Sequence, residues 1–332
     1  MFGLFDRLLG HSMECVQRSR FLRLLATGGT LWPDAAHLGW AEQDVDGGPD
    51  APKVLLVVAH PDDESECAAV IYRVTRELGG IVDQAIVTDG QAGFQWSGPA
   101  EAVYGLDLGN ENVARQHLPR IRRKEVLRAN KILGVRDTYF FDQLDTGMTF
   151  DPLEGLRAWK THFVRDALVR LMDRERYDLI LTLLPDEDTH GHHQSVAILV
   201  LQAVAEFPEE LRPGVVGVKT AGERESFAEF LGREGFPLTR TTSVEPVWSF
   251  DRRTQLTNSR LDYSIIVHWV IAEHKSQGMF QMEFGRRRYE QFWLFAVSGC
   301  AGRLRWERVQ ERLGASKMTE VGGREVRRHA YA

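Results

Sequence analysis

Residues 53–64, with the sequence KVLLVVAHPDDE, decide the fold. The run 54–58 contains only leucine and valine, which is typical of a parallel strand buried on both faces. A polar segment, residues 60–64, follows at once. From Asp62 onward apolar residues recur at helical spacing until the pair of glycines at 79–80 ends the helix. We therefore predict a strand, a polar loop and a helix in direct succession.

The same alternation continues along the chain. We expect strands at residues 86–87, 138–141 and 179–184, and helices at residues 121–133 and around residues 164–172. Alternating strands and helices predict an α/β, Rossmann-like fold, in which helices cover both faces of a mostly parallel sheet. In such sheets ligands bind beyond the carboxyl ends of the strands. The loops that follow residues 58 and 184 are therefore expected at the same edge.

Composition limits the classes of function. The 332 residues are 43% hydrophobic and carry a net charge of −6 without a basic block, which argues against nucleic acid as a partner. The three cysteines are far apart, so we expect neither disulfides nor a thiolate metal site, and a cytoplasmic location fits best. Apolar runs are too short for a transmembrane span. Oligomerisation, including a homo-oligomer, stays open.

Three regions are expected from the distribution of turn formers and charge. Residues 1–50 form an N-terminal extension, residues 51–314 form the main domain, and residues 315–332 form a polar tail. The extension alternates apolar and basic residues without the continuous apolar core of a signal peptide. It either packs against the domain or a partner subunit, or touches a membrane surface.

Two clusters of polar residues follow predicted strands. His60 comes just before a proline, and Asp63 lies in the first turn of the next helix, so both can face one point. Catalytic zinc commonly takes three protein ligands and leaves a position for water. Residues 185–193, PDEDTHGHH, supply further candidates, among them His190 and His193. One imidazole of this pair can bind the metal while the other lies beside the substrate.

The neighbouring carboxylates Asp62 and Asp63 indicate divided roles. One would bind the cation, and the other would take a proton from metal-bound water, as in a hydrolase. Each residue also has a purely structural interpretation. The two aspartates can cap and stabilise the helix start, which is worth about 1 kcal/mol. His60 can be a buried core residue, and the histidine-rich loop can be an exposed surface loop.

The motif AHPDDE at residues 59–64, with His190 and His193 three positions apart, resembles the LmbE-like (PIG-L) superfamily of metal-dependent de-N-acetylases. The resemblance extends from about Lys53 to Gln277. It includes further matching segments at residues 88–91 (TDGQ), 122–125, 133–135, 145–148 (DTGM) and 274–277 (HKSQ). That family includes the N-acetylglucosaminyl-phosphatidylinositol deacetylases and the enzymes that deacetylate glucosaminyl-inositol and glucosaminyl-malate thiol precursors.

The resemblance implies a role for each matching residue. It implies that His60, Asp63 and His193 bind zinc, with another divalent metal such as Fe²⁺ as the alternative. It also implies that Asp62 is the general base and that His190 stabilises the oxyanion and assists the leaving amine. By the same resemblance Arg122 and Asp145 would hold the substrate, although Arg122 can equally be a helix-surface cation and Asp145 a turn former.

Two positions depart from the family pattern. Members commonly carry His-Pro-Asp-His where this chain has His190-Gly191-His192-His193, so the usual carboxylate partner of His190 is replaced. Asp188 can take over that role, or His192 can compete for the metal. Gln91 stands where a glutamate is frequent, which implies a changed substrate contact.

His274 lies in an apolar helical stretch and is interpreted as a packing residue. Glu64 is expected only to support the helix start.

The expected function is removal of the acetyl group from a small N-acetylated amino-sugar conjugate. Two alternatives remain at this point. The same metal centre can serve an amidase or esterase that acts on a non-sugar acyl conjugate. The fold can also belong to a non-catalytic binding protein. A glycolipid substrate at a membrane is compatible with the amphipathic start of the chain.

Overall fold

The computed structural model describes residue 48 and residues 51–225, 228–278 and 286–314. The chain divides into two units, residues 1–44 and 45–332, and all of the first lies outside the described residues. The expected N-terminal extension, apart from Gly48, and the expected polar tail also lie outside them. The division into residues 1–50, 51–314 and 315–332 therefore stays a prediction.

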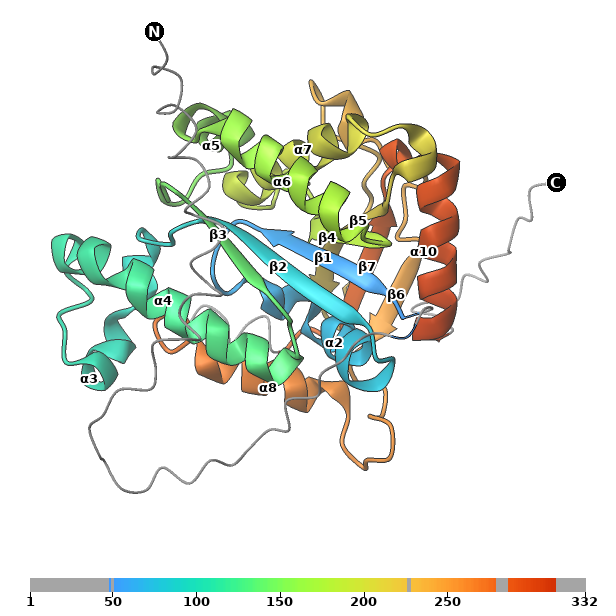
Figure 1. Ribbon diagram of the computed structural model, residues 1–332. Coiled ribbons are helices and arrows are strands. Elements are labelled where there is room, and N and C mark those ends of the chain that lie inside the picture. Colours follow the sequence, from blue (N-terminus) through green and yellow to red (C-terminus); the bar gives the residue numbers. More distant parts are fainter. Residues whose placement is uncertain (1–47, 49–50, 226–227, 279–285, 315–332) are drawn as a thin grey trace, which may run out of the picture. The chain divides into compact units, whose positions relative to one another are not determined.

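A seven-stranded sheet organises the main unit, with the strand order β3-β2-β1-β4-β5-β7-β6 (Figure 1). The strands are β1 (Lys53–Val58), β2 (Ile81–Thr88), β3 (Thr138–Gln143), β4 (Leu179–Leu183), β5 (Gly214–Ala221), β6 (Trp248–Asp251) and β7 (Tyr289–Leu294). The first five are parallel, whereas β7 pairs antiparallel with both β5 and β6. The predicted mostly parallel α/β fold is thus confirmed.

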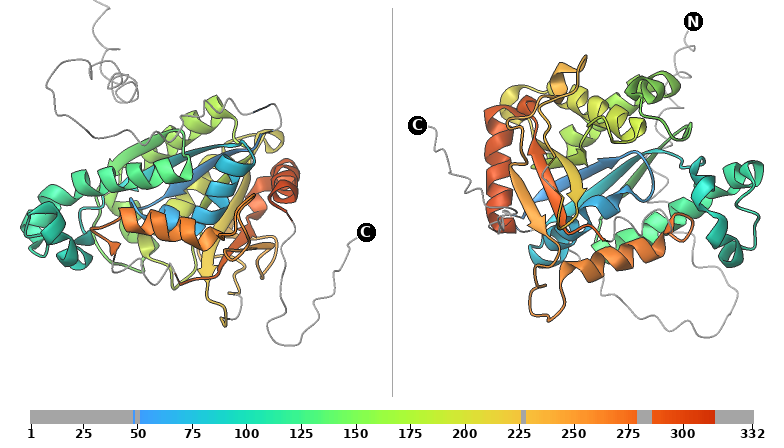
Figure 2. Two further views of the ribbon diagram at one scale, coloured as in Figure 1. Left: turned by 90° about the horizontal axis from the view of Figure 1, so that it is seen from below. Right: turned by 180° about the vertical axis from the view of Figure 1, so that it is seen from behind.

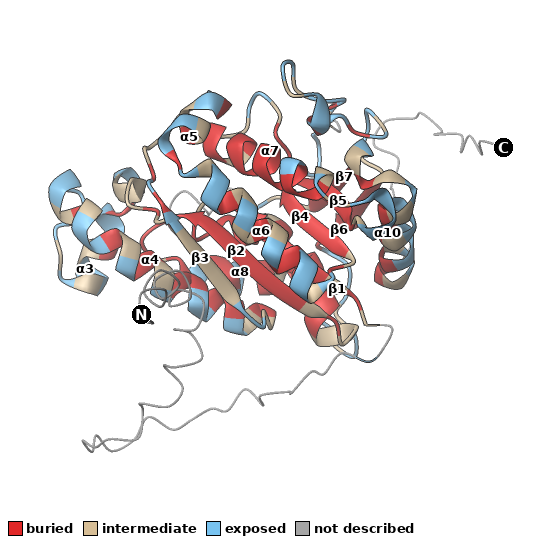
Figure 3. Cartoon of the chain, turned by 45° about the horizontal axis from the view of Figure 1, so that its top comes forward, coloured by how far each residue is buried: buried red, intermediate tan, exposed pale blue. Residues whose placement is uncertain are grey.

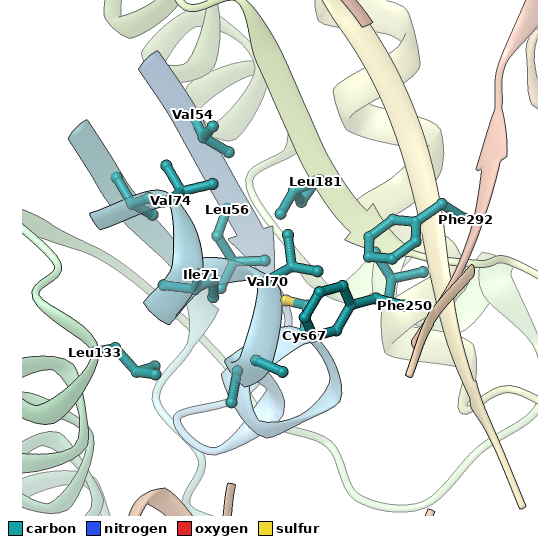
Figure 4. Packing of buried hydrophobic residues seen from close by; sticks show 14 of the residues in the cluster. Val54, Leu56, Cys67, Val70, Ile71, Val74, Leu133, Leu181, Phe250 and Phe292 are labelled. Carbon is teal, nitrogen blue, oxygen red and sulfur yellow. The ribbon is translucent and has the colours of Figure 1, made fainter. Parts of the chain in front are cut away.

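Helices cover both faces of this sheet (Figures 1 and 2). One face packs against α2 (Ala68–Tyr72), α4 (Glu111–Leu133), α8 (Tyr263–Glu273) and α10 (Gly299–Leu313), and the other against α5 (Pro152–Ala158), α6 (Thr161–Glu175) and α7 (Gly191–Ala205). A short helix, α3 (Glu101–Tyr104), precedes α4. Alternate residues of β1 enter the two cores: Val54 and Leu56 lie in one, Leu55 and Val57 in the other. Figure 4 shows the first of these cores, and Figure 3 shows the burial of the central strands.

Several predicted segments differ in detail from the observed ones. The helix expected after the polar loop is broken into a 3-10 turn (Asp63–Cys67), α2 and a π-helical turn (Arg73–Glu77). The helix expected at 121–133 begins ten residues earlier, where the Asn110 side chain accepts hydrogen bonds from two first-turn amides, and Pro119 lies inside it. It ends as predicted at Gly134, which takes a left-handed conformation (φ 75°) that glycine adopts readily.

The antiparallel strand β7 anchors the start of α2 through a buried carboxylate. Both oxygens of Glu290 accept hydrogen bonds from first-turn amides of α2, those of Ala69 and Val70, each at 3.0 Å. Arg252 donates to the same carboxylate through Nε at 3.0 Å, and both side chains are fully buried. A carboxylate at a helix N-terminus is stabilising, and the arginine neutralises it. The antiparallel strand β7 thus holds the helix that follows the polar loop.

Among the residues that the structure describes, no helix combines the length and apolarity needed to cross a bilayer.

Candidate metal centre and active-site pocket

Two neighbouring parallel strands bring the polar clusters together. β1 and β4 pair in the register Val54↔Leu179, so their carboxyl ends lie side by side. His60 follows β1, and Asp63 begins the 3-10 turn behind it. The second cluster follows β4, where His190 is the N-cap of α7 and His193 lies in its first turn. Residues separated by 133 positions thereby meet at one edge of the sheet.

The side chains of His60, Asp63 and His193 converge on one point. His60 Nδ1 lies 3.1 Å from His193 Nε2 and 3.6 Å from Asp63 Oδ2, and His193 Nε2 lies 3.2 Å from Asp63 Oδ1. Donors bound tetrahedrally at about 2.0–2.1 Å from one zinc ion are about 3.3 Å apart. Two imidazoles and a carboxylate at these separations therefore fit a divalent metal such as zinc.

The ionisable side chains of His60, Asp63 and His193 shift each other's pKa values. Burial by itself raises the pKa of Asp63, but the imidazoles of His193 and His60 hold that pKa well below its ordinary value. Burial lowers the pKa of His60, and the Asp63 carboxylate outweighs this effect, so the pKa of His60 is raised. The backbone amide of His60 also donates to Asp63 Oδ2 at 2.7 Å, which fixes the carboxylate. The donor set is thus held in place by the loop itself.

Asp62 lies beside this group and is held by Arg122. The Arg122 guanidinium donates through Nη2 to Asp62 Oδ1 at 2.7 Å and through Nη1 to the carbonyl of Gly90 at 2.7 Å. Both side chains are nearly buried, with 5% of Asp62 and 3% of Arg122 exposed. Burial lowers the pKa of Arg122, but Asp62 and Asp145 outweigh it and raise that pKa. Arg122 is therefore no helix-surface cation, and its observed contact is with the expected base.

Replacing Arg122 with glutamine is expected to lower the free energy of unfolding by about 3–5 kcal/mol, because it leaves the Asp62 carboxylate buried without its charged partner. Denaturant unfolding followed by circular dichroism measures this loss. The double variant Arg122→Gln/Asp62→Asn removes both charges and should be more stable than Arg122→Gln alone. Equal stability of these two variants would contradict the pairing.

His190 is oriented by the backbone. Its Nδ1 accepts from the amide of His192 at 3.1 Å, which places the ring proton on Nε2, where it can be donated to the carbonyl of Gly147 at 3.1 Å. The amide of Thr149 lies 3.3 Å from the same Nε2. Burial and the imidazoles of His60, His193 and His192 lower the pKa of His190 to about 2, so the ring is neutral. Asp188, one expected partner of His190, is exposed and contacts it in no hydrogen bond of the described residues.

His192 and Asp145 lie behind His60. His192 is fully buried, and its Nδ1 lies 3.2 Å from His60 Nε2. Asp145 Oδ1 lies 3.6 Å from His192 Nδ1 and 4.0 Å from His60 Nε2, so these three residues form a second group that could hold a metal. Asp145 also accepts from the amides of Ala92 (3.2 Å) and Gly147 (3.1 Å). Its observed contacts thus organise the loops around the centre.

A pocket of about 290 Å³ opens above the proposed ligands. Its polar side contains His60, Asp62, Asp63, Arg122, Asp145, Thr146, His190, His193 and Gln277. Phe94, Trp96 and Met148 supply an apolar side, and Arg115 lies near them with its guanidinium 5.7 Å from the centre of the Phe94 ring. Two aromatic side chains, those of Phe94 and Trp96, thus line the pocket.

The HKSQ segment, residues 274–277, directly follows α8 and contacts the segments that carry Glu64 and Gly93. His274 is fully buried, as a packing residue would be, and its Nε2 pairs with Glu64, which is also fully buried. The expectation that Glu64 only supports the helix start was wrong, because its carboxylate binds a histidine 210 positions away. Gln277 donates through Nε2 to the carbonyl of Gly93 at 3.0 Å and lines the pocket. The shared HKSQ motif was the only sequence signal for these contacts.

Part of the chain is similar in sequence to known proteins. Residues 55–204 match the family model described as GlcNAc-PI de-N-acetylase, PIG-L. A curated protein of Bacillus cereus, named probable N-acetyl-alpha-D-glucosaminyl L-malate deacetylase 2, is 28% identical over 174 residues, which cover 52% of this chain and 70% of that protein. The protein of the same name from Bacillus subtilis is 26% identical over 179 residues, covering 54% and 71%.

Among solved structures, the N,N'-diacetylchitobiose deacetylase from Pyrococcus horikoshii superimposes with a TM-score of 0.48 at 19% identity, covering 75% of this chain and 85% of that one. The family match and the curated relatives confirm the resemblance drawn from the sequence. Residues 55–204 of the chain therefore match the PIG-L (LmbE-like) family, and the curated relatives of the chain are named as deacetylases, enzymes that hydrolyse an amide bond.

Proposed function

We propose that the protein is a zinc-dependent hydrolase that removes the acetyl group from a small N-acetylated amino-sugar conjugate. The observation that carries this proposal is the convergence of His60 Nδ1, Asp63 and His193 Nε2, with separations of 3.1–3.6 Å, beside the buried carboxylate of Asp62. Imidazole and carboxylate donors suit zinc, and Fe²⁺ is the alternative with the same ligands.

Bound metal would polarise the acyl carbonyl and lower the pKa of a water molecule. Asp62 is the base in this proposal. Its carboxylate lines the pocket, and the hydrogen bond from Arg122 Nη2 at 2.7 Å fixes its orientation. It accepts the proton of the attacking water and returns a proton to the leaving amine. Arg122 positions this base. Its side chain also lines the pocket, so it can contact the bound substrate.

His190 is proposed to stabilise the negative charge that develops on the carbonyl oxygen. Its neutral ring carries a proton on Nε2, which now donates to the carbonyl of Gly147 at 3.1 Å. His190 and Gly147 both line the pocket, so a substrate oxygen placed there can take over this hydrogen bond. His190 thus acts as a hydrogen-bond donor, and proton transfer is left to Asp62.

The pocket supports a sugar conjugate as substrate. Its volume of about 290 Å³ lies near the lower end of the range for small-ligand sites, about 300–1,000 Å³, and suits one sugar ring with a small substituent. Phe94 and Trp96 also line the pocket and offer aromatic rings on which the C–H face of a sugar can stack. The Bacillus relatives are named for an N-acetylglucosaminyl malate substrate, which has this composition.

A substrate panel tests this proposal. The zinc-loaded protein should release acetate and free amine from N-acetylglucosamine conjugates with a kcat/KM at least about 100-fold above that for N-acetyl amino acids or simple acyl esters. Removal of the metal with a chelator should abolish turnover, and zinc or Fe²⁺ should restore it. Faster hydrolysis of the non-sugar amides or esters would show that the sugar assignment is wrong. The absence of hydrolysis with every substrate would reject the hydrolase proposal.

A further inference from the structure

We propose that a chain of hydrogen bonds, from His60 through His192 and Thr146 to Glu154, sets the tautomer of His60 so that Nδ1 is available to the metal. This inference rests on the proposed metal site. His192, Thr146 and Glu154 are positioning residues in it, because they act through His60 and do not touch the metal. The chain uses the histidine that this sequence carries at position 192.

Three consecutive contacts form the chain. His60 Nε2 lies 3.2 Å from His192 Nδ1, and His192 Nε2 lies 2.8 Å from Thr146 Oγ1. Thr146 Oγ1 lies 2.8 Å from Glu154 Oε1. All three separations are within hydrogen-bond range. His192 contacts His60 through Nδ1 and Thr146 through Nε2, and His60 contacts His192 through Nε2 while its Nδ1 faces the proposed metal site. The chain leads from the proposed metal site to the first turn of α5.

The direction of every hydrogen bond follows from its last member. A carboxylate only accepts, so the hydroxyl of Thr146 donates its single proton to Glu154. Thr146 must then accept from His192, which places the His192 proton on Nε2 and leaves a lone pair on Nδ1. His192 Nδ1 consequently accepts from His60 Nε2–H. The lone pair of His60 therefore lies on Nδ1, the nitrogen that faces Asp63 and His193.

Packing holds the middle of the chain in place. His192 is fully buried, with its ring 5.2 Å from that of Trp159 and 4.7 Å from that of His190, measured between ring centres. Glu154 lies near the solvent at the other end, and hydrogen bonds from Thr149 and Thr146 hold its pKa below the ordinary value. The chain thus ends on an ionised acceptor. A histidine that binds metal generally needs such a partner for its second ring nitrogen.

A second metal ion could bind at the first link of the hydrogen-bond chain, between His60 and His192. His60 Nε2, His192 Nδ1 and Asp145 Oδ1 lie 3.2–4.0 Å apart, which also suits a cation. Such a cation would require His60 to give up its Nε2 proton, and the hydrogen-bond chain would then be broken at its first link. The 2.8 Å contact between His192 Nε2 and Thr146 Oγ1 leaves the lone pair of His192 on Nδ1 in both arrangements, so the two arrangements differ in whether His60 Nε2 carries a proton. Metal stoichiometry separates the two arrangements.

The variant Thr146→Val tests the chain because valine has the shape of threonine but no hydroxyl. We expect it to weaken zinc affinity about 10-fold, measured by competition with a chromogenic chelator. Thr146→Ser keeps the hydroxyl and should retain the affinity. Thr182→Val is the matched control, since the buried Thr182 hydroxyl has no hydrogen-bond partner among the residues that the structure describes. This variant should bind zinc as the unmodified protein does.

Nitrogen NMR of the zinc-loaded protein with ¹⁵N-labelled histidine gives a readout other than activity. We expect a protonated Nε2 on both His60 and His192, and loss of this preference at His192 in Thr146→Val. Three results would overturn the inference: a His60 without Nε2–H, two zinc ions per chain, or equal zinc affinities of Thr146→Val and Thr182→Val. Zinc binding with the expected NMR signals but no hydrolysis would reject the proposed function alone.

Discussion

Replacing Asp62 with asparagine is expected to lower kcat for acetate release by about 10²–10⁴-fold, the usual contribution of a general base, while bound zinc stays unchanged. Asparagine has the shape of aspartate and can still accept the hydrogen bond from Arg122 Nη2 through its amide oxygen. It cannot take a proton from water. The loss should therefore appear in kcat, and zinc content measured by atomic absorption should equal that of the unmodified protein.

The control for this variant is Asp173→Asn, since Asp173 lies exposed on α6 and pairs only with Arg176 among the described residues. It should retain full activity. If Asp62→Asn hydrolysed its substrate at an undiminished rate, Asp62 would not be the base, and another carboxylate of the pocket would have to be tested. If it lost zinc as well, Asp62 would belong to the metal-binding group.

Replacing His60 with glutamine is expected to remove both metal and activity. His60 lies within 3.1–3.6 Å of the other two proposed ligands, and two remaining ligands do not hold zinc tightly. We expect zinc affinity to fall by about 1,000-fold or more, equivalent to about 4 kcal/mol or more, and acetate release to fall below detection. Equilibrium dialysis against buffered zinc measures the first quantity.

His268→Gln is the matched control for the loss of an imidazole, because His268 lies exposed on α8 and its ring contacts the carbonyl of Ser264 in its own helix. It should leave zinc content and turnover unchanged. Retention of stoichiometric zinc by His60→Gln would contradict the proposed ligand set. It would equally contradict the two other groups of possible ligands among the described residues, His60-His190-His193 and His60-Asp145-His192, because both contain His60.

The parallel part of the fold was predictable because its signals are local. The central strands are continuous apolar runs, and a strand buried on both faces needs such a run wherever it lies in the chain. The strand β7 carries no such signal, because Glu290 and Gln291 interrupt its apolar residues. Glu290 is tolerated in the core only because Arg252 and two helix amides satisfy it, and these partners are distant in sequence.

The same distinction applies to the site. The meeting of the two polar loops followed from strand ends that share one edge, so His60, Asp63 and the histidines of the second loop could be expected together. The pairing of Arg122 with Asp62 could not, because it depends on how α4 is rotated against the sheet. Likewise the contact between His192 and His60 depends on the first turn of α7, where a change of one residue would direct a different side chain inward.

The adjacency of β1 and β4 also links metal binding to folding. The proposed ligands come from segments that follow these two strands, and more than 100 residues, which include β2, β3 and their helices, separate the two strands in the sequence. An unfolded chain therefore has no complete site, and metal binds the native state in preference. By mass action, free zinc at about 100 times its dissociation constant stabilises the native state by about 2.7 kcal/mol. The melting temperature of the protein should consequently rise with zinc concentration, so that thermal unfolding serves as a binding assay even before a substrate is known.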